Sequence, residues 1–178
     1  MRIAIDIDDT LVDTSKMIKE YVKKLDKKYI ENVKDIMIDN MKNPIVVEFY
    51  DKYLEEISDN AKLKDDVDLI NKLYNNHEIY IITARSENFI DNVDQKTKRL
   101  LDKFNIKYHK IITGAGRKAE VCVKNNIDLL IDDSIKHCTN FKQKGGKVLL
   151  FDSINNRNID IDLPRVYSWK EVYDIINS

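Results

Sequence analysis

The sequence predicts an α/β protein with a doubly wound, largely parallel sheet and a helical insertion. Short apolar runs of strand length alternate with longer segments in which apolar residues recur every three to four positions. Several of these runs end directly in carboxylate or hydroxyl side chains, at the edge where open α/β sheets bind ligands. Roughly fifty residues of helical pattern separate the first run from the second, far more than an ordinary connection needs.

Composition narrows the class of protein. The chain has 178 residues, of which 43% are hydrophobic and 34% charged, and its formal net charge is -1. This length suits one domain with a sizeable insertion. Neither disorder nor a basic surface for a nucleic-acid polymer is indicated. No run reaches the length of a membrane span, and the first strand already carries Asp6, unlike a signal peptide, so we expect a cytoplasmic protein without a membrane partner.

The two cysteines, Cys122 and Cys138, are too few for a disulfide framework. We expect free, mostly buried thiols. His137 stands next to Cys138, but two ligands without a second pair do not make the usual zinc pattern, so a helix face is the better interpretation.

The chain opens with a predicted strand in which Ile3, Ile5 and Ile7 alternate with other residues. Asp6 and Asp8 share a face if the strand extends that far. Two unit charges about 4 Å apart cost roughly 4 kcal/mol at a surface-like dielectric, so the pair needs a cation, a shared proton or solvent. Taken alone, a solvated turn that caps the next helix explains the same residues.

Residues 13–61 are predicted to form a small helical cap inserted after the first strand. Apolar residues recur there at helical spacing, and Asn43 followed by Pro44 is typical of an N-cap and a first helical residue. The core domain then comprises residues 1–12 and 62–178.

The helix that begins at Pro44 has a broad aromatic stripe, including Phe49, Tyr50 and Tyr53. Core packing is the simpler explanation for any single aromatic residue. The stripe has more side chains than one core contact needs, so we predict that some of the three stack on the organic part of a ligand.

The second strand is predicted over residues 77–85 and ends in Thr83, Ala84 and Arg85. Ser86 is then the expected N-cap of a long helix whose apolar face begins at Phe89.

A third strand is predicted over residues 110–113. The glycines that follow match neither a dinucleotide-binding nor a P-loop pattern. A short helix over residues 117–126 contains Lys118, and a fourth strand ends in Asp132 and Asp133.

Beyond the fourth strand, Ser134 opens another helix, and residues 147–151 form the fifth strand. Ser168 and Glu171 have capping-box spacing before a closing helix.

Strands separated by helices imply right-handed crossovers and a strand order of 3-2-1-4-5. The switch point then lies between strands one and four. Asp6, Asp8, Asp132 and Asp133 therefore surround one crevice.

This constellation suits phosphate chemistry. Mg²⁺ binds carboxylate oxygens and keeps waters that a substrate phosphate replaces. Thr83 is placed to donate to a phosphoryl oxygen and Lys118 to neutralise its charge. Asp6 is placed as an attacking carboxylate, and Asp8 as the group that protonates the leaving oxygen.

The motifs resemble, in the same order, those of the haloacid dehalogenase-like (HAD) superfamily. They are Asp6-Ile-Asp8-Asp9-Thr10-Leu11, Thr83, Lys118 and Asp132-Asp133. The resemblance implies a Rossmann-like HAD core and an Mg²⁺-dependent phosphomonoester hydrolase that works through an aspartyl-phosphate. It implies a nucleophile and metal ligand at Asp6, an acid/base and metal ligand at Asp8, metal ligands at Asp132 and Asp133, and phosphate contacts from Thr83, Ala84, Arg85 and Lys118.

More narrowly, the insertion and the Ile-Thr-Ala-Arg, Leu-Ile-Asp-Asp-Ser and Val-Tyr-Ser-Trp stretches are similar to the 5′(3′)-deoxyribonucleotidase branch and its bacterial relatives. This implies a 5′-nucleotidase acting on (deoxy)nucleoside monophosphates. Asp9 stands where many deoxyribonucleotidases carry Gly, and no residue here maps onto their base-binding aromatics, so the base preference stays open.

Two alternatives remain: a phosphatase for another small metabolite such as a sugar phosphate, and a receiver-like signalling module. A receiver has its phosphoacceptor on a middle strand and lacks the helical insertion. We expect a small phosphomonoester substrate and a monomer or homodimer.

Overall fold

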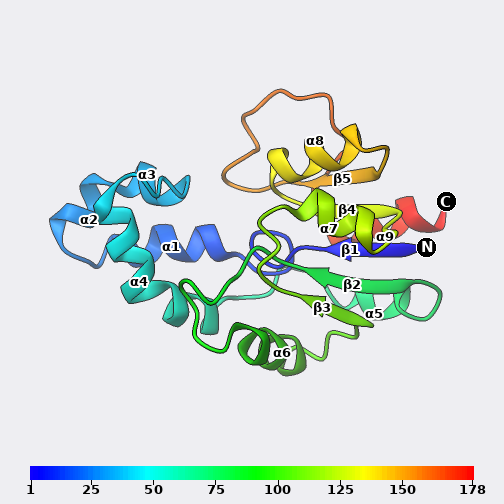
Figure 1. The fold of residues 1–178 in the computed structure, drawn as a ribbon, viewed down its shortest axis with the longest axis horizontal. Helices are drawn as coiled ribbons and strands as arrows, with labels where there is room; N and C mark the ends of the chain where they lie inside the picture. Colours follow the sequence, from blue (N-terminus) through cyan, green and yellow to red (C-terminus); the bar gives the residue numbers. More distant parts are fainter.

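A computed structural model describes residues 1–178 and is built around a six-stranded sheet (Figure 1). The strand order is β3-β2-β1-β4-β5-β6, and every neighbouring pair is parallel. The predicted order 3-2-1-4-5 is confirmed, and one short strand extends it. The strands are β1 (Arg2–Ile5), β2 (Glu78–Ile82), β3 (Lys110–Ile112), β4 (Leu129–Asp132), β5 (Lys147–Phe151) and β6 (Arg165–Val166).

Helices cover both faces of the sheet, as predicted for a doubly wound fold. Along β1, Ile3 and Ile5 belong to a core shared with α5, α6 and α9, whereas Ala4 belongs to a core shared with α7 and α8. These helices are α5 (Leu69–Leu73), α6 (Val93–Lys103), α7 (Lys118–Lys124), α8 (Ile135–Gln143) and α9 (Trp169–Asn177).

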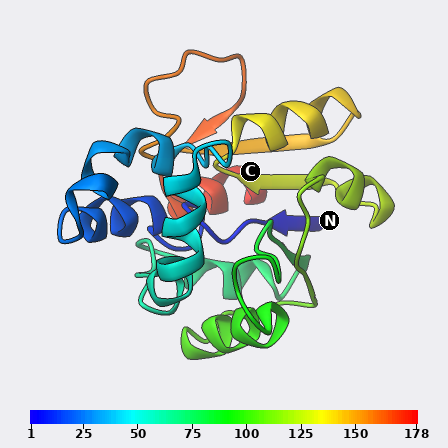
Figure 2. The ribbon, with the colours of Figure 1, turned by 60° about the vertical axis from the view of Figure 1, so that its left-hand side comes forward.

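Four further helices pack on one another beyond the carboxyl end of β1 (Figures 1 and 2). They are α1 (Thr14–Val22), α2 (Lys27–Glu31), α3 (Val33–Met37) and α4 (Pro44–Asp59), called the helical cluster below. The cluster has its own core, made of Ile18, Val22, Tyr29, Ile36, Val46, Phe49, Tyr50 and Ile57. The predicted N-cap of α4 is confirmed, because the Asn43 side chain accepts a hydrogen bond from the Ile45 N–H at 3.0 Å.

The chain enters and leaves the helical cluster through two adjacent extended segments. Val12 and Leu63 form an antiparallel bridge. The Asp13 N–H donates to the Lys62 carbonyl at 2.9 Å. The two crossings therefore support each other through backbone hydrogen bonds.

The helix expected from Ser86 begins only at Val93. The Glu87 carboxylate accepts hydrogen bonds from the N–H groups of Asn92 and Val93, both at 3.0 Å, so Glu87 rather than Ser86 satisfies the helix start. Asn92 adopts a left-handed conformation with φ of 54°, which breaks any continuous helix before it. Phe89 therefore lies in a turn.

The predictions of two helix caps and of free, buried cysteines are confirmed. Ser134 and Ser168 cap α8 and α9 through their side chains. Cys122 and Cys138 are free and buried. None of the helices is both long enough and apolar enough to cross a bilayer.

Candidate active site

The loop after β1 is held from two sides. The N–H groups of Thr10 and Leu11 donate to the Ile7 carbonyl, the latter at 2.8 Å. From α9, the buried Trp169 Nε1 donates to the Thr10 carbonyl at 3.0 Å. Asp9 adopts φ of 57°, which turns the chain sharply. The loop is thus fixed by backbone contacts and by a distant aromatic anchor.

Asp6 and Asp8 do not share a strand, because β1 ends at Ile5. Asp6 directly follows the strand, and its N–H donates to the Ile131 carbonyl at 3.0 Å. Asp8 lies in the loop. The condition for a shared strand face, a strand that extends to Asp8, is therefore not met, although both carboxylates line one cavity.

Lys118 joins two of the predicted site carboxylates. Its Nζ lies 2.8 Å from Asp6 Oδ1 and 2.5 Å from Asp132 Oδ2, and the side chain is only 1% exposed. Burial alone lowers the pKa of this lysine, but the two carboxylates outweigh it and raise the pKa above its usual range. The second oxygen of Asp132 accepts a hydrogen bond from the Ser134 N–H at 2.8 Å.

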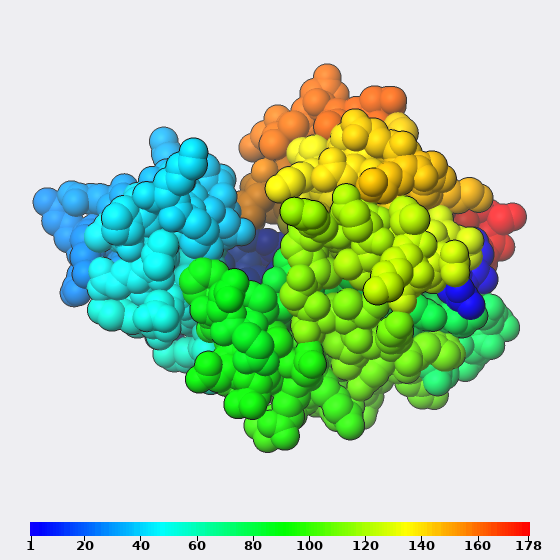
Figure 3. Space-filling view, viewed as in Figure 1, coloured from blue at the N-terminus to red at the C-terminus, as the bar shows by residue number.

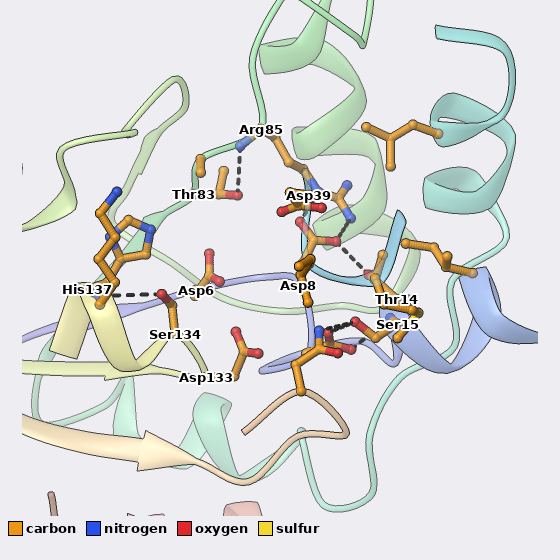
Figure 4. Close-up of a pocket in the computed structure, with 18 of the residues that line it drawn as sticks. Asp6, Asp8, Thr14, Ser15, Asp39, Thr83, Arg85, Asp133, Ser134 and His137 are labelled. Carbon is orange, nitrogen blue, oxygen red and sulfur yellow. Dashed lines mark hydrogen bonds and ion pairs between the residues drawn. The ribbon is translucent and has the colours of Figure 1, made fainter. Parts of the chain in front are cut away.

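Arg85 forms a bidentate ion pair with Asp8. Its Nε lies 2.9 Å from Oδ2 and its Nη2 lies 2.8 Å from Oδ1, while Thr14 Oγ1 donates to Oδ1 at 2.5 Å. Burial raises the pKa of Asp8, but the Arg85 charge and these hydrogen bonds outweigh it and hold the pKa below its usual value. Figure 4 shows Asp8 between Arg85 and Thr14, and in this arrangement Asp8 is ionised.

Asp9 connects the loop after β1 to α1 and to the segment after β5. Its oxygens accept hydrogen bonds from the Ser15 N–H, at 2.9 Å, and from the Ser15 hydroxyl. Asn155 Nδ2 donates to the same hydroxyl at 2.8 Å. Burial raises the pKa of Asp9 to about 6.

Three carboxylates are arranged to hold a cation. Asp6, Asp132 and Asp133 each offer an oxygen, and these oxygens lie within 4.8 Å of one another. Burial and then neighbouring carboxylates raise the pKa of Asp133 well above its usual value. Burial raises that of Asp6 to about 6, although Lys118 opposes it. A cluster with this excess of negative charge fits a hard divalent cation such as Mg²⁺.

The pKa of Asp6 predicts how stability responds to pH when no metal is bound. An acid whose pKa is higher in the folded state binds more protons when folded, so lowering the pH stabilises that state. Between about pH 7.5 and about pH 5, the free energy of unfolding of the wild type should rise by about 1 kcal/mol relative to Asp6→Asn. Urea unfolding in chelator at several pH values measures this difference. A difference that is constant, or that falls as the pH is lowered, contradicts it.

A cavity of about 570 Å³ separates the helical cluster from the carboxyl edge of the sheet. Figure 3 shows the hollow beside the blue and cyan cluster. Asp132 is fully buried, and its carboxylate contacts Lys118 and the Ser134 N–H. The other predicted site residues all line the cavity: Asp6, Asp8, Thr83, Ala84, Arg85, Lys118 and Asp133.

The aromatic residues of α4 divide between two environments. Tyr50 lines the cavity, and its stacking on a ligand stays a prediction. Phe49 and Tyr53 do not, and their rings lie 5.5 Å apart, packed against Tyr29 inside the helical cluster. For these two, core packing is the correct interpretation.

Several cavity residues were not predicted from the sequence. Asp39 follows α3, and Phe89, which the sequence assigned to a helix face, lies in the turn before α6. His137 also lines the cavity, and burial followed by the Lys118 charge lowers its pKa to about 4, so its imidazole is neutral near pH 7. The sequence did contain a signal for His137: it is a polar residue in the first turn of a helix that begins at the carboxyl edge of the sheet.

Comparison with protein families gives a match along the whole chain. Residues 1–178 match the family described as 5′ nucleotidase, deoxy (pyrimidine), cytosolic type C protein. A Clostridium acetobutylicum protein described as a nucleotidase is 34% identical over 133 residues, which are 73% of this chain and 67% of that protein.

Solved structures share the fold at low identity. A HAD-superfamily hydrolase (subfamily IA, variant 1) from Geobacter sulfurreducens has a TM-score of 0.65 at 13% identity, covering 99% of this chain and 96% of its own. A Bacillus subtilis protein described as a putative HAD-hydrolase, YfnB, bound to magnesium, has a TM-score of 0.64 at 15% identity, covering 99% and 98%.

Proposed function

Since the chain belongs to the family of cytosolic type C 5′ nucleotidases, deoxy (pyrimidine), and is a phosphatase, we propose that it hydrolyses nucleoside 5′-monophosphates through a phosphorylated Asp6. The observation that carries this proposal is that two carboxylates and two cations line one cavity. Lys118 is paired with Asp6, and Arg85 is paired with Asp8. The family match argues against a receiver-like signalling module.

The site fits Mg²⁺, with Asp6, Asp132 and Asp133 as the side chains that would hold it. When bound, the ion offsets the charge of the carboxylates and of the substrate phosphate.

Asp6 attacks the phosphorus atom, and the bond from phosphorus to the ester oxygen breaks as the bond to the carboxylate forms. The leaving oxygen takes a proton from Asp8. Asp8 then takes a proton from water, whose oxygen attacks the phosphorus and releases inorganic phosphate with Asp6 regenerated. Lys118 keeps Asp6 ionised for the first step, because its Nζ lies 2.8 Å from Asp6 Oδ1.

Arg85 has to change partner during this cycle. In its bidentate pair with Asp8 it favours the carboxylate form, which has no proton to give. A bound phosphate offers the same guanidinium a second bidentate acceptor. Once Arg85 turns to the phosphate, burial dominates and raises the pKa of Asp8 towards the value that an acid needs.

The helical cluster serves as the cap, with residues 13–61 as its extent. Its contribution to the cavity wall is largely apolar and includes Tyr50, which suits the organic part of a small ester. The cavity, about 570 Å³, has room for a nucleotide or a sugar phosphate but not for a polymer or a folded phosphoprotein.

A screen of phosphate esters tests this function. Nucleoside 5′-monophosphates, hexose phosphates and p-nitrophenyl phosphate are offered with Mg²⁺ or with EDTA, and phosphate release is measured. We expect release from at least one nucleotide, loss of activity in EDTA and its return with Mg²⁺. Full activity in EDTA contradicts the metal requirement. Efficient hydrolysis of hexose phosphates with none of nucleotides establishes the sugar-phosphate alternative.

A further inference from the structure

Asp39 is a carboxylate of the cavity that has no role in the chemistry above. Ten of the lining residues come from the helical cluster and the turn after α3, and Asp39 is the only charged one: Thr14, Ser15, Ile18, Met37, Ile38, Asp39, Met41, Tyr50, Leu54 and Ser58. The positively charged residues of the cavity, by contrast, come from the sheet side: Arg85, Lys118 and Lys136. The wall that faces the leaving group is therefore largely apolar, and Asp39 carries its only charge.

The Asp39 side chain is fixed in place. Its backbone is left-handed, with φ of 51°, in the turn between α3 and α4. The Tyr50 hydroxyl lies within hydrogen-bond distance of Asp39 Oδ1 and 2.9 Å from the Ile36 carbonyl oxygen. Because Tyr50 belongs to the core of the helical cluster, it holds Asp39 at the cavity.

Asp39 also lies close enough to the phosphate end of the cavity to interact with it. Burial and then the Asp8 charge raise the pKa of Asp39. Asp39 and Asp8 are both labelled in Figure 4, and the charge of Asp8 acts on Asp39. Arg85 nevertheless pairs with Asp8, and Asp39 Oδ2 accepts no hydrogen bond from any residue. No cation of the chain offsets the Asp39 charge.

We propose, on the basis of the phosphatase function above, that Asp39 is a specificity-determining residue that restricts the leaving group to an uncharged one. A monophosphate places its only anionic group among Arg85, Lys118 and the metal ligands. A bisphosphate or a phosphorylated acid would place a second anionic group near the Asp39 carboxylate. Like charges a few ångströms apart in a partly buried site exclude such ligands by repulsion.

Asp39→Asn tests this role, because Asn tolerates the left-handed backbone and keeps an oxygen for Tyr50 while removing the charge. Affinities for a nucleoside 5′-monophosphate and its 3′,5′-bisphosphate are measured by calorimetry with Mg²⁺, in the Asp6→Asn background so that neither ligand is consumed. A hexose 6-phosphate and its 1,6-bisphosphate form a second matched pair. Asp51→Asn, an exposed change on α4 that makes the same difference in charge, is the control.

With Asp39 present, the monophosphate should bind about tenfold or more tightly than the bisphosphate in at least one pair. Asp39→Asn should reduce this ratio at least about fivefold, and Asp51→Asn should leave it unchanged. In otherwise wild-type protein, Asp39→Asn should change kcat/KM for p-nitrophenyl phosphate less than about threefold, because that leaving group has no second charge.

A ratio that Asp39→Asn does not alter, or that Asp51→Asn alters equally, overturns the role of Asp39. If only the hexose pair shows this discrimination, the role of Asp39 is retained. The nucleotidase function is then rejected separately, by a hydrolysis screen in which no nucleotide is a substrate. If wild-type protein hydrolyses none of the four ligands and the Asp6→Asn protein binds none of them, both the role of Asp39 and the phosphatase function are overturned.

Discussion

Replacing Asp6 by Asn is expected to reduce kcat by about 10³-fold or more, with the fold retained. The amide keeps the shape of the side chain, but it is a poor nucleophile and is not held by Lys118 as an anion. Phosphate release under saturating substrate and Mg²⁺ measures the loss. Acid-quenched wild-type protein should also carry a phosphoryl group on the peptide that contains Asp6, detectable by mass spectrometry.

Asp51→Asn controls for the change in charge and should retain wild-type turnover, because Asp51 is exposed on α4 away from the cavity. A folded Asp6→Asn protein that retains more than about a tenth of wild-type kcat would falsify covalent catalysis by this residue.

Lys118→Met is expected to lower the free energy of unfolding more than any other substitution proposed for this protein. The methionine fills much of the same volume but leaves the buried carboxylates of Asp6 and Asp132 without their shared cation. Removing one partner of a buried ion pair typically costs about 3–5 kcal/mol. Urea unfolding in chelator should therefore show a free energy of unfolding lower by about that amount. Added Mg²⁺ should restore part of it, because binding to the folded state alone is stabilising.

The matched control is Lys170→Met, which breaks an exposed pair with Asp174 whose atoms lie 2.7 Å apart. Exposed pairs contribute little, so a change within about 0.5 kcal/mol is expected. Equal effects of the two substitutions would show that the buried position of Lys118 has no energetic consequence.

The sheet and its acidic edge were predictable because each depends on a local pattern with a fixed spatial meaning. Apolar runs that end in Asp6, Asp132 or Thr83 place those residues at the carboxyl edge whatever the exact strand limits are. The strand ends differ from the predicted ones by a few residues, yet Asp6 and Thr83 line the cavity and Asp132 lies behind it, paired with Lys118. Only the shared face of Asp6 and Asp8 depended on an exact strand end, and the strand ends at Ile5, before either residue.

The helical side of the site was less predictable, because periodicity identifies an apolar face without saying what covers it. Phe49 and Tyr50 are adjacent, but only the second reaches the cavity. Asp39 occupies a turn between two helices, where an acidic residue carries no signal of its own. The start of α6 depends on the Glu87 side chain, a contact that competes with the ordinary N-cap at Ser86.

The paired crossings at Asp13 and Lys62 give the chain a modular organisation. Their backbone atoms are hydrogen-bonded at 2.9 Å, so the two ends of the segment between them are held together. Replacing that segment by one of a different length therefore costs little additional loop-closure entropy. No sheet pairing involves residues 14–61. The wall that contains Asp39 thus lies in one contiguous stretch of the chain, which contacts the catalytic edge through Thr14 and Ser15 at its start.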